Sequence, residues 1–356
     1  MKLIIGRQTF EIQKESLPDP GAFANVSWQK EISHFLTQWF DDKDFIELKT
    51  SGSTGEPKTI RLPKETMHRS AVMTNSFFHL SEESVALLCL PASYIAGKMM
   101  LVRAIVGNYT LLAVEPSANP FATAVFPALD FTANTPYQLL HSSEDIPRLS
   151  IKHIIVGGSQ VSLKMEELIA DWSTQLYETF GMTETASHIA LRPLNGENKS
   201  TYFHTLEGIE LSQDKRGCLV IDAPHLSAEQ LITNDLVELK DNHSFRWLGR
   251  IDRVINSGGI KIFPEQVERK LQSLFTLPYF ITSLPSETLG WQVVLVIEST
   301  ELTEAELSSL RTAMKSLLDP YELPGRIICL PKFVYSAGNK LLRKDTMTLL
   351  NEQNTL

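Results

Sequence analysis

The 356-residue sequence contains little cysteine, no long apolar run and no excess of positive charge. Its three cysteines, Cys89, Cys218 and Cys329, form neither a C-x-x-C motif nor the His/Cys spacing of a zinc site, which predicts reduced, structural thiols. No apolar stretch approaches the ~18 residues that span a membrane, and the N-terminus lacks the apolar centre of a signal peptide. We therefore expect a cytoplasmic protein without a membrane span.

The formal net charge of −9 argues against nucleic acids and anionic membranes as main partners. With 43% hydrophobic and 21% charged residues, the chain has the composition of a soluble enzyme. Its length predicts more than one domain, because single cores stop growing near ~250 to 300 residues. Small anionic molecules remain as partners for local basic loops, and the sequence leaves homo-oligomer formation open.

The most informative segment is residues 50–58, T-S-G-S-T-G-E-P-K. Its glycines allow backbone N–H groups to turn inward, its hydroxyls add donors, and Lys58 adds a positive charge beside the stiff Pro57. Such a loop suits a polyphosphate. It differs from a Walker A loop because no G-K-[ST] opens a helix, which argues against a P-loop NTPase. A flexible Ser/Gly linker is the alternative, but residues 45–50 and 59–62 have the pattern of flanking strands.

Alternating helical and extended patterns predict an α/β fold with a large, mostly parallel layered sheet. Apolar and aromatic residues recur at helical spacing over residues 27–41, which indicates a core-facing stripe. Further helices are expected near residues 64–78, 99–106 and 163–172, and strands near 85–90, 109–114, 151–156 and 175–180. Gly157, Gly158 and the turn after residue 180 follow strands, where ligands bind in open α/β sheets.

The pattern changes after Arg250 to a small α+β arrangement. Helices are expected at residues 264–274 and 304–318, and strands at 293–297 and 327–330. We therefore predict a large N-terminal domain over residues 1–248, a connecting hinge over 249–253 and a small mobile C-terminal domain over 254–356.

Four further motifs follow the phosphate loop: F-G-M-T-E at 180–184, T-N-D at 233–235, G-R-I-D at 249–252 and G-N-K-L-L-R at 338–343. Together and in this order they resemble the adenylate-forming superfamily, which contains acyl- and aryl-CoA synthetases, luciferases and peptide-synthetase adenylation domains. The resemblance runs from residue 45 to the C-terminus. It implies the AMP-binding fold, here shortened at the N-terminus, with ATP, Mg²⁺ and coenzyme A as cofactor and co-substrates.

The resemblance also implies the reaction, in which a small-molecule carboxylic acid attacks the α-phosphate of ATP and the acyl-adenylate then forms a thioester. Lys340 is implied as the catalytic lysine, and Glu184 with Thr183 as support for the magnesium ion. Asp235 and Arg250 are implied to hold the ribose. The remaining nucleotide-binding positions are Thr50, Ser51, Gly52, Ser53, Thr54, Gly55, Lys58, Gly157, Gly158, Ser159, Thr179, Phe180, Gly181 and Met182.

For the thioester step, the resemblance implies that the C-terminal domain turns about Asp252. Gly258, Gly259 and Lys261 would then approach the site and let a pantetheine arm pass close to the backbone. A static linker and an ordinary glycine turn are the alternatives for these two segments.

The run at residues 179–188, T-F-G-M-T-E-T-A-S-H, most resembles the o-succinylbenzoate:CoA ligases of menaquinone biosynthesis. L-P-A-S-Y-I-A-G at 90–97 resembles a family motif in which Tyr94 replaces a histidine, so the acid is left open. Tyr94, Gly97, Lys98 and Arg103 are expected near the acyl pocket, with Lys98 or Arg103 facing a second carboxylate. The alternatives are an enzyme that loads a carrier-protein thiol and a noncatalytic nucleotide-binding module.

Overall fold

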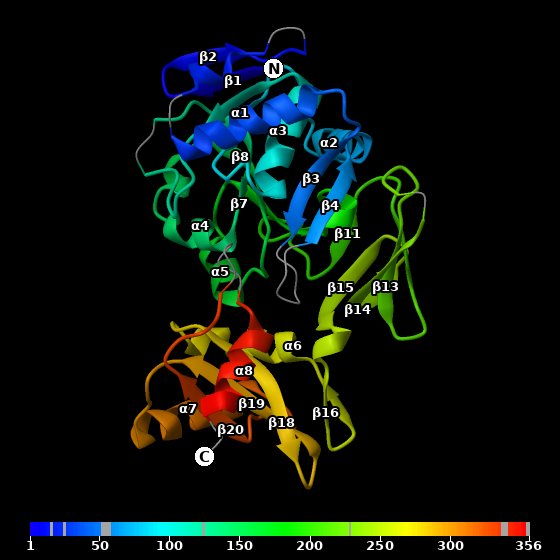
Figure 1. Cartoon of the computed structure of the whole chain (residues 1–356). Helices are drawn as coiled ribbons and strands as arrows, with labels where there is room; N and C mark the ends of the chain where they lie inside the picture. Colours follow the sequence, from blue (N-terminus) through cyan, green and yellow to red (C-terminus); the bar gives the residue numbers. More distant parts are fainter. Residues whose placement is uncertain are drawn as a thin grey trace.

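The computed structural model describes residues 1–14, 17–23, 26–50, 58–122, 125–227, 229–335 and 341–353. Figure 1 shows a large lobe that contains the N-terminus and a smaller C-terminal lobe below it. The α/β fold with a small C-terminal domain that the sequence predicts is confirmed.

A sheet of 13 described strands forms the large lobe, in the order β12-β13-β14-β15-β11-β10-β9-β8-β7-β5-β6-β1-β2. The strands from β9 to β1 in this order are parallel, and the remaining neighbours are antiparallel. The sheet is therefore mixed rather than parallel throughout. The strands are β1 (Lys2–Ile5), β2 (Gln8–Glu11), β5 (Val85–Leu88), β6 (Thr110–Ala113), β7 (Leu129–Asn134), β8 (Ile151–Val156), β9 (Gln175–Gly181), β10 (His188–Pro193), β11 (Phe203–Thr205), β12 (Glu210–Gln213), β13 (Cys218–Asp222), β14 (Leu231–Asp241) and β15 (Ser244–Arg250).

The change from parallel to antiparallel pairing follows from the connections. Long crossovers, three of which carry helices, join the parallel strands β5 to β9, as parallel neighbours require. From β10 to β15 the described chain contains no helix, and each of these strands pairs antiparallel with its neighbours in the sheet. The helices of the large lobe are α1 (Ser27–Phe40), α2 (Lys64–Phe77), α3 (Ile95–Gly107), α4 (Pro136–His141) and α5 (Leu163–Leu168), with short 3₁₀ helices at Pro20–Ala22, Ile146–Arg148 and Thr183–Thr185.

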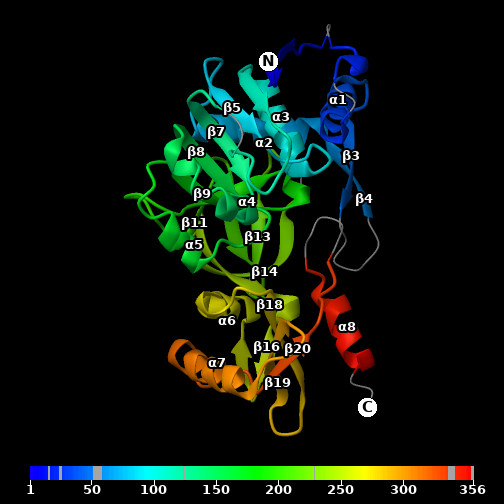
Figure 2. The ribbon, with the colours of Figure 1, turned by 90° about the vertical axis from the view of Figure 1, so that its left-hand side faces the viewer.

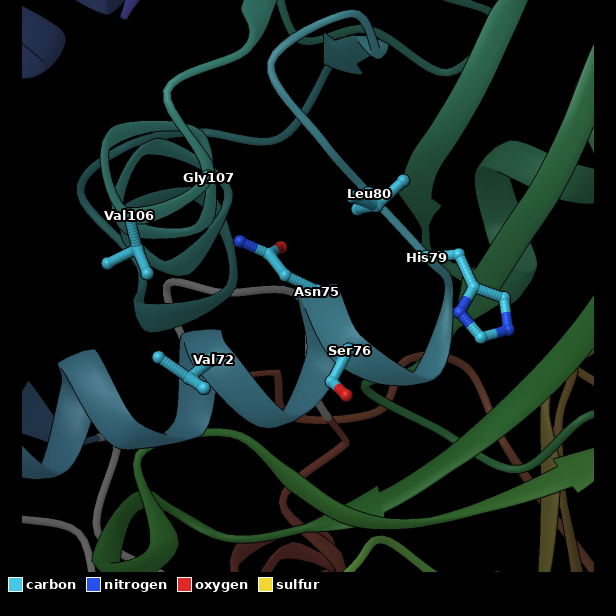
Figure 3. Close-up of a pocket in the computed structure, with 7 residues that line it drawn as sticks. All are labelled: Val72, Asn75, Ser76, His79, Leu80, Val106 and Gly107. Atoms are coloured by element: carbon cyan, nitrogen blue, oxygen red, sulfur yellow. The ribbon is translucent and has the colours of Figure 1, made fainter.

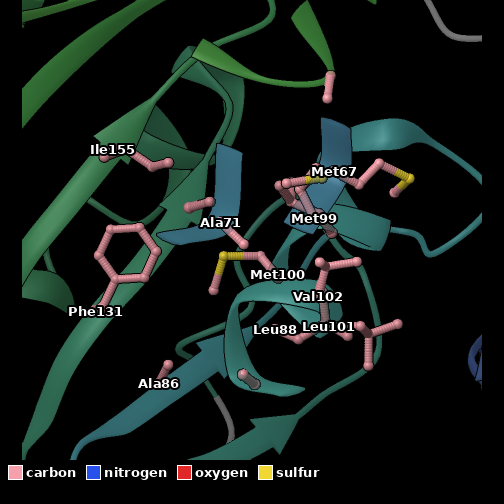
Figure 4. Packing of buried hydrophobic residues seen from close by; sticks show 14 of the residues in the cluster. Met67, Ala71, Ala86, Leu88, Met99, Met100, Leu101, Val102, Phe131 and Ile155 are labelled. Carbon is pink, nitrogen blue, oxygen red and sulfur yellow. The ribbon is translucent and has the colours of Figure 1, made fainter. Parts of the chain in front are cut away.

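Helices α2 and α3 pack against the parallel strands and form the main core. Met67 and Ala71 of α2 meet Met99 and Met100 of α3 beside Phe131 of β7 (Figure 4). Every residue from Gly97 to Ala104 in α3 is buried, because this helix is covered on all sides. The predicted stripe on α1 is confirmed, since Ile32, Phe35 and Leu36 are buried there.

Two further strands, β3 (Phe45–Thr50) and β4 (Lys58–Pro63), pair as a separate antiparallel hairpin. This confirms the strands predicted on either side of the phosphate loop. Thr50 and Lys58 face each other as the last described pair, and residues 51–57 between them lie outside the described residues.

The C-terminal lobe has its own sheet, in the order β17-β16-β19-β18 with β20 paired to β19. Its helix α6 faces the large lobe (Figure 2). The strands are β16 (Ile255–Ser257), β17 (Ile260–Ile262), β18 (Tyr279–Ser286), β19 (Gly290–Glu298) and β20 (Arg326–Leu330); the helices are α6 (Pro264–Leu271), α7 (Glu304–Leu317) and α8 (Arg343–Gln353), with 3₁₀ turns at Ile251–Arg253 and Gln272–Leu274.

A buried ion network joins the strands β9 and β10 to helix α5. Arg192, 2% exposed, donates to Glu178 (2.6 and 2.8 Å) and to Glu166 (2.9 Å). The other oxygen of Glu178 accepts a hydrogen bond from the Val161 backbone N–H at 2.8 Å. The guanidinium of Arg192 in β10 thus links β9 to helix α5.

A second buried polar cluster lies between α3, α2 and the start of β10. The Arg103 guanidinium of α3, 2% exposed, donates to the Ser187 hydroxyl. The imidazole of His188 lies 3.3 Å from Ser187 Oγ and 3.4 Å from Thr74 Oγ1. Burial, reinforced by the charge of Arg103, holds the pKa of His188 well below its ordinary value, so this imidazole is neutral near pH 7.

We predict that Arg192→Met destabilises the large lobe by about 3 to 5 kcal/mol, because the buried carboxylate of Glu178 loses the only ion-pair partner that it has among the described residues. Urea unfolding followed by circular dichroism measures the change. Arg61→Met is the matched control, since Arg61 forms a 3.3 Å ion pair with Glu47 but is 69% exposed, and its loss should change the stability little. Equal unfolding curves for Arg192→Met and the wild type would contradict the structural role of the network.

We also predict an acid-labile contribution from His188. The unfolded chain binds a proton on this residue below about pH 6.5, whereas the folded chain does not until a much lower pH. The free energy of unfolding should therefore fall by about 1.4 kcal/mol per pH unit below about pH 6.5 from this residue alone. Unfolding of wild type and His188→Asn at pH 7.5 and 5.5 tests this, and an equal pH dependence of the two proteins would refute it.

Candidate active site

The carboxyl ends of β8 and β9 bring two predicted nucleotide segments side by side. The strands are parallel neighbours, with Val156 level with Glu178, so Gly157 to Ser159 and Thr179 to Gly181 emerge at one edge. The Thr179 hydroxyl donates to the Val156 carbonyl at 3.2 Å. A Cβ on Gly157 would overlap that hydroxyl, so glycine is needed for this close approach.

The turn after β9 has a rigid inner side and an open outer side. Thr185 is fully buried, and its hydroxyl accepts from Met182 N at 3.1 Å and donates to Ser187 O at 2.7 Å. A Cβ on Gly181 would overlap the backbone of Ser187, so the turn can close only with glycine there. This leaves Thr183 partly exposed and Glu184 exposed on the outer side of the turn.

The Phe180 ring packs against two aromatic side chains. Its centroid lies 4.9 Å from that of Phe245 in an edge-on arrangement and 5.8 Å from that of Phe203. Phe180 remains partly exposed, so part of its ring is available to a planar ligand.

Asp235 and Arg250 lie directly opposite each other on β14 and β15. Asp235 Oδ1 accepts a hydrogen bond from the Trp247 indole N–H at 2.9 Å. Arg250 donates to both oxygens of Asp252, at 3.1 and 3.3 Å, and this hydrogen bonding raises the pKa of Arg250. Partial burial alone would raise the pKa of Asp252, but the hydrogen bond and charge of Arg250 lower it below its usual value.

Helix α6 connects this pair of strands to the β8–β9 edge. Its Gln266 side chain donates to the carbonyls of Trp247 and Leu248, at 3.2 and 3.0 Å. Its Arg269 donates to Glu166 of α5 at 3.0 Å. Because a helix rises 1.5 Å per residue, Gln266 and Arg269 are separated by only about 4.5 Å along its axis. The end of β15 and the region after β8 therefore converge on one helix, α6. This helix lies at the junction of the two lobes (Figure 2).

A cavity of about 230 Å³ lies where α6 meets the loop after β8. Predicted residue Ser159 contributes to its wall. The lining residues are Ser159, Gln160, Glu268, Arg269, Gln272 and Tyr279.

The residues predicted for the acyl pocket follow β5. Tyr94 is 49% exposed at the start of α3, and a Cβ on Gly97 would overlap the Pro91 carbonyl. The ammonium of Lys98 donates to the carbonyls of Ala92 (2.6 Å) and Ser93 (3.0 Å), and burial lowers its pKa. Lys98 thus stabilises the turn that leads into α3.

Arg103 has a different environment. Burial lowers its pKa to about 10, and no carboxylate pairs with it anywhere in the described ranges. Its Nε–H is buried without a hydrogen-bond partner among the described residues. A buried cation in this state has unused capacity to bind an anion.

Gly258 and Gly259 form the tip of the β16–β17 hairpin, with φ of 56° and 84°. The two positive φ angles are those of a tight hairpin turn, for which glycine is favoured. Gly258 N donates to Leu289 O in the same lobe at 2.9 Å, and Lys261 is exposed. These contacts lie within the C-terminal lobe and do not join the hairpin to the strand edge of the large lobe.

Some predicted residues lie outside the described part of the chain: Lys340, the loop residues Ser51, Gly52, Ser53, Thr54 and Gly55, and the side chains of Thr50 and Lys58.

Conversely, the sequence reasoning missed Thr185, Ser187 and Trp247. Thr185 and Ser187 lie inside the T-E-T-A-S-H run, which was a usable signal. Trp247 had no such signal, because its contact depends on strand register.

A larger, open cavity of about 510 Å³ lies between the C-terminal ends of α2 and α3 (Figure 3). None of the residues predicted from the sequence lines it. Its lining residues are Val72, Asn75, Ser76, His79, Leu80, Val106 and Gly107.

Among the described residues, no group of three or more His, Cys, Asp or Glu side chains is placed to hold a metal ion. None of the helices in the described ranges has the length and hydrophobicity needed to cross a membrane.

Comparison with known proteins agrees with this architecture. Residues 46–211 match the AMP-binding enzyme family. An acyl-CoA synthetase (AMP-forming)/AMP-acid ligase II-like protein from Dyadobacter fermentans is 35% identical, with a TM-score of 0.60, over 92% of this chain and 95% of that protein.

More distant relatives include 2-succinylbenzoate–CoA ligase of Bacillus mycoides, 24% identical over 96% of this chain and 78% of that protein. The O-succinylbenzoate coenzyme A synthetase of Bacillus subtilis, solved with ATP and magnesium, is 21% identical with a TM-score of 0.70, covering 85% of this chain and 69% of that one. The family match, the Dyadobacter relative and the motifs at the strand ends agree: this chain belongs to the AMP-binding enzymes of the adenylate-forming superfamily.

Proposed function

We propose that this protein is an AMP-forming acid:CoA ligase, which activates a carboxylate as an acyl-adenylate and then transfers the acyl group to the thiol of coenzyme A. The observation that carries the proposal is that two parts of the large lobe converge at helix α6. They are the β8–β9 edge and the end of β14 and β15 at which Asp235 and Arg250 pair. The family match and the Dyadobacter relative named as an acyl-CoA synthetase support the same reaction class.

The chemistry follows from the weak electrophilicity of a carboxylate. Its oxygen attacks the α-phosphorus of ATP, the bond to the β-phosphate oxygen breaks, and pyrophosphate leaves. The acyl-phosphate bond then gives the thiol a good leaving group, AMP. Negative charge on the α-phosphate oxygens grows during the first step and requires cationic and N–H donors, a role proposed for Lys340.

The nucleotide would extend along the strand edge. Gly157, Gly158 and Ser159 would border the adenine, with the partly exposed ring of Phe180 as a stacking surface. Thr179, Gly181 and Met182 shape the same turn, and Asp235 would accept the ribose hydroxyls with Arg250 beside it. Residues 50–55 and Lys58 would cradle the β- and γ-phosphates.

A magnesium ion fits this set of residues. Magnesium keeps several waters and takes one or two carboxylates together with phosphate oxygens, so the exposed Glu184, next to Thr183, suffices without a cluster of protein ligands. When bound, the ion would neutralise phosphate charge.

The acid we propose is o-succinylbenzoate, the substrate of menaquinone biosynthesis that also gives the Bacillus relatives their names. Arg103 supports this assignment, because a buried guanidinium without a carboxylate partner among the described residues suits the second carboxylate of a diacid. Lys98 is less suited, since backbone carbonyls already engage its ammonium. Tyr94 and Gly97 would border the aromatic part.

We propose domains at residues 1–248 and 254–356 with a hinge at 249–253. Asp252 is the proposed pivot, and its pairing with Arg250 would fix one orientation of the hinge. Turning of the C-terminal lobe would replace the α6 face with the hairpin of Gly258, Gly259 and Lys261, past which the pantetheine arm would reach the adenylate.

ATP/pyrophosphate exchange over a panel of acids tests the function, followed by thioester detection with free CoA. We expect o-succinylbenzoate to drive exchange at least ~10-fold faster than benzoate or a fatty acid, since a site built for a second carboxylate discriminates against acids that lack it. Equal exchange with all acids would exclude the menaquinone assignment. Transfer only to a phosphopantetheinyl protein would indicate carrier loading, and ATP binding without exchange would indicate a noncatalytic module.

A second prediction concerns Lys340. Lys340→Ala should slow adenylation by at least ~10²-fold while leaving ATP binding nearly unchanged, because the lysine acts on charge that develops only in the transition state. Single-turnover adenylation and equilibrium ATP titration separate the two effects. Lys344→Ala, an exposed lysine on α8, is the control and should behave as wild type. An unaffected exchange rate in Lys340→Ala would remove this lysine from the mechanism.

A further inference from the structure

We infer that Trp247 is the positioning residue for the ribose-binding carboxylate: its indole N–H fixes Asp235 so that the second carboxylate oxygen faces the sugar hydroxyls. The inference rests on the proposed ribose role of Asp235 and adds a residue that no sequence motif indicates. It starts from the 2.9 Å hydrogen bond between Trp247 Nε1 and Asp235 Oδ1.

A register shift places the indole on the correct face of the sheet. Asp235 pairs with Arg250 and Leu236 with Gly249, but the next pair is Val237 with Trp247. Leu248 is therefore the extra residue of a β-bulge. Directly opposed residues point to the same face, so Trp247 shares the face of Val237 and Asp235. Without the shift it would lie opposite Glu238, which is on the exposed face.

Asp235 is held at its backbone and at its carboxylate by different partners. The backbone N–H of Asp235 donates to the Thr233 hydroxyl at 3.0 Å, and the indole N–H fixes Oδ1. A carboxylate has about four acceptor positions, so Oδ2 and the remaining lone pair of Oδ1 are still available to two adjacent hydroxyls. A fixed acceptor loses less entropy on binding than a rotating one.

The bulge is in turn held by the C-terminal lobe. Gln266 of α6 donates to both bulge carbonyls, those of Trp247 and Leu248. Gly249 beside the bulge has φ of 145°, and a Cβ there would lie 2.6 Å from Glu265 Oε2 of the same helix. The position of the indole therefore depends on where α6 docks.

The test compares ATP with 2′,3′-dideoxyadenosine triphosphate in the pyrophosphate exchange assay. For Trp247→Phe we expect kcat/KM to fall roughly tenfold with ATP and less than about twofold with the dideoxy nucleotide. The substitution removes the hydrogen bond that orients Asp235, and this orientation matters only for a nucleotide whose ribose hydroxyls bind to that carboxylate. The KM for ATP should carry most of the change. Trp39→Phe makes the same substitution at another partly buried indole and should leave the ratio unchanged. Its helix, α1, lies on the side of the large lobe away from the C-terminal lobe (Figure 1).

The outcomes separate this inference from the proposed function. If Asp235→Ala keeps the preference for ATP, the ribose role of Asp235 fails and the inference fails with it. If Asp235→Ala removes the preference for ATP but Trp247→Phe keeps it, only the positioning role is overturned. The same holds if Trp247→Phe lowers kcat/KM equally for both nucleotides. Thermal unfolding checks each variant. Should Trp247→Phe not fold, benzothienylalanine at position 247 keeps the ring and removes the N–H, with the same expected ratio.

Discussion

The close contact between the carboxyl ends of β8 and β9 is the constraint on which the candidate site depends. The Thr179 hydroxyl can reach the Val156 carbonyl only because Gly157 has no side chain, and the following turn closes only because Gly181 has none. Both glycines are thus required by packing before any ligand is considered. The contact also sets what lies outside it: with Thr185 buried inside the turn, Thr183 and Glu184 are directed outward.

Buried charge supports this edge from behind. Arg192 neutralises Glu178 in β9 and Glu166 in α5, and Glu178 also holds the Val161 N–H after the glycine turn. Arg103, on the opposite side of the sheet's core, reaches the turn through Ser187 without a carboxylate of its own within the described chain. The charge of Arg192 is balanced by carboxylates, so its role is structural, whereas Arg103 still has an N–H donor without a partner among the described residues. This difference, rather than burial, is what makes Arg103 and not Arg192 a candidate for binding an anion.

Much of the fold was predictable from the sequence where helices and strands alternate. The expected strand at residues 151–156 agrees with β8, and the helix expected from residue 163 begins there as α5, with the Ser162 hydroxyl accepting from Met165 N at 2.8 Å. Strands β10 to β15 were not predicted, because no helices alternate with them and antiparallel strands pair by register rather than by crossover. Strand register also limits how much of the candidate site could be predicted. Gly157 follows a recognisable strand and Phe180 lies at the end of another, but the side of β15 on which Trp247 lies is decided by one extra residue, which no local pattern specifies.

The contacts between the lobes also bear on the proposed rotation of the C-terminal lobe. If α6 leaves, Glu166 loses Arg269 but keeps Arg192 at 2.9 Å and the ammonium of Lys199 at 3.5 Å. The buried carboxylate of Glu166 therefore stays paired, so separation costs far less than the loss of a sole partner would. The carbonyls of Trp247 and Leu248 instead lose Gln266, and the bulge that orients Asp235 is released. The ion pair would therefore permit the proposed movement with little penalty, while the amide contact would make the proposed binding of the nucleotide sugar depend on where α6 docks.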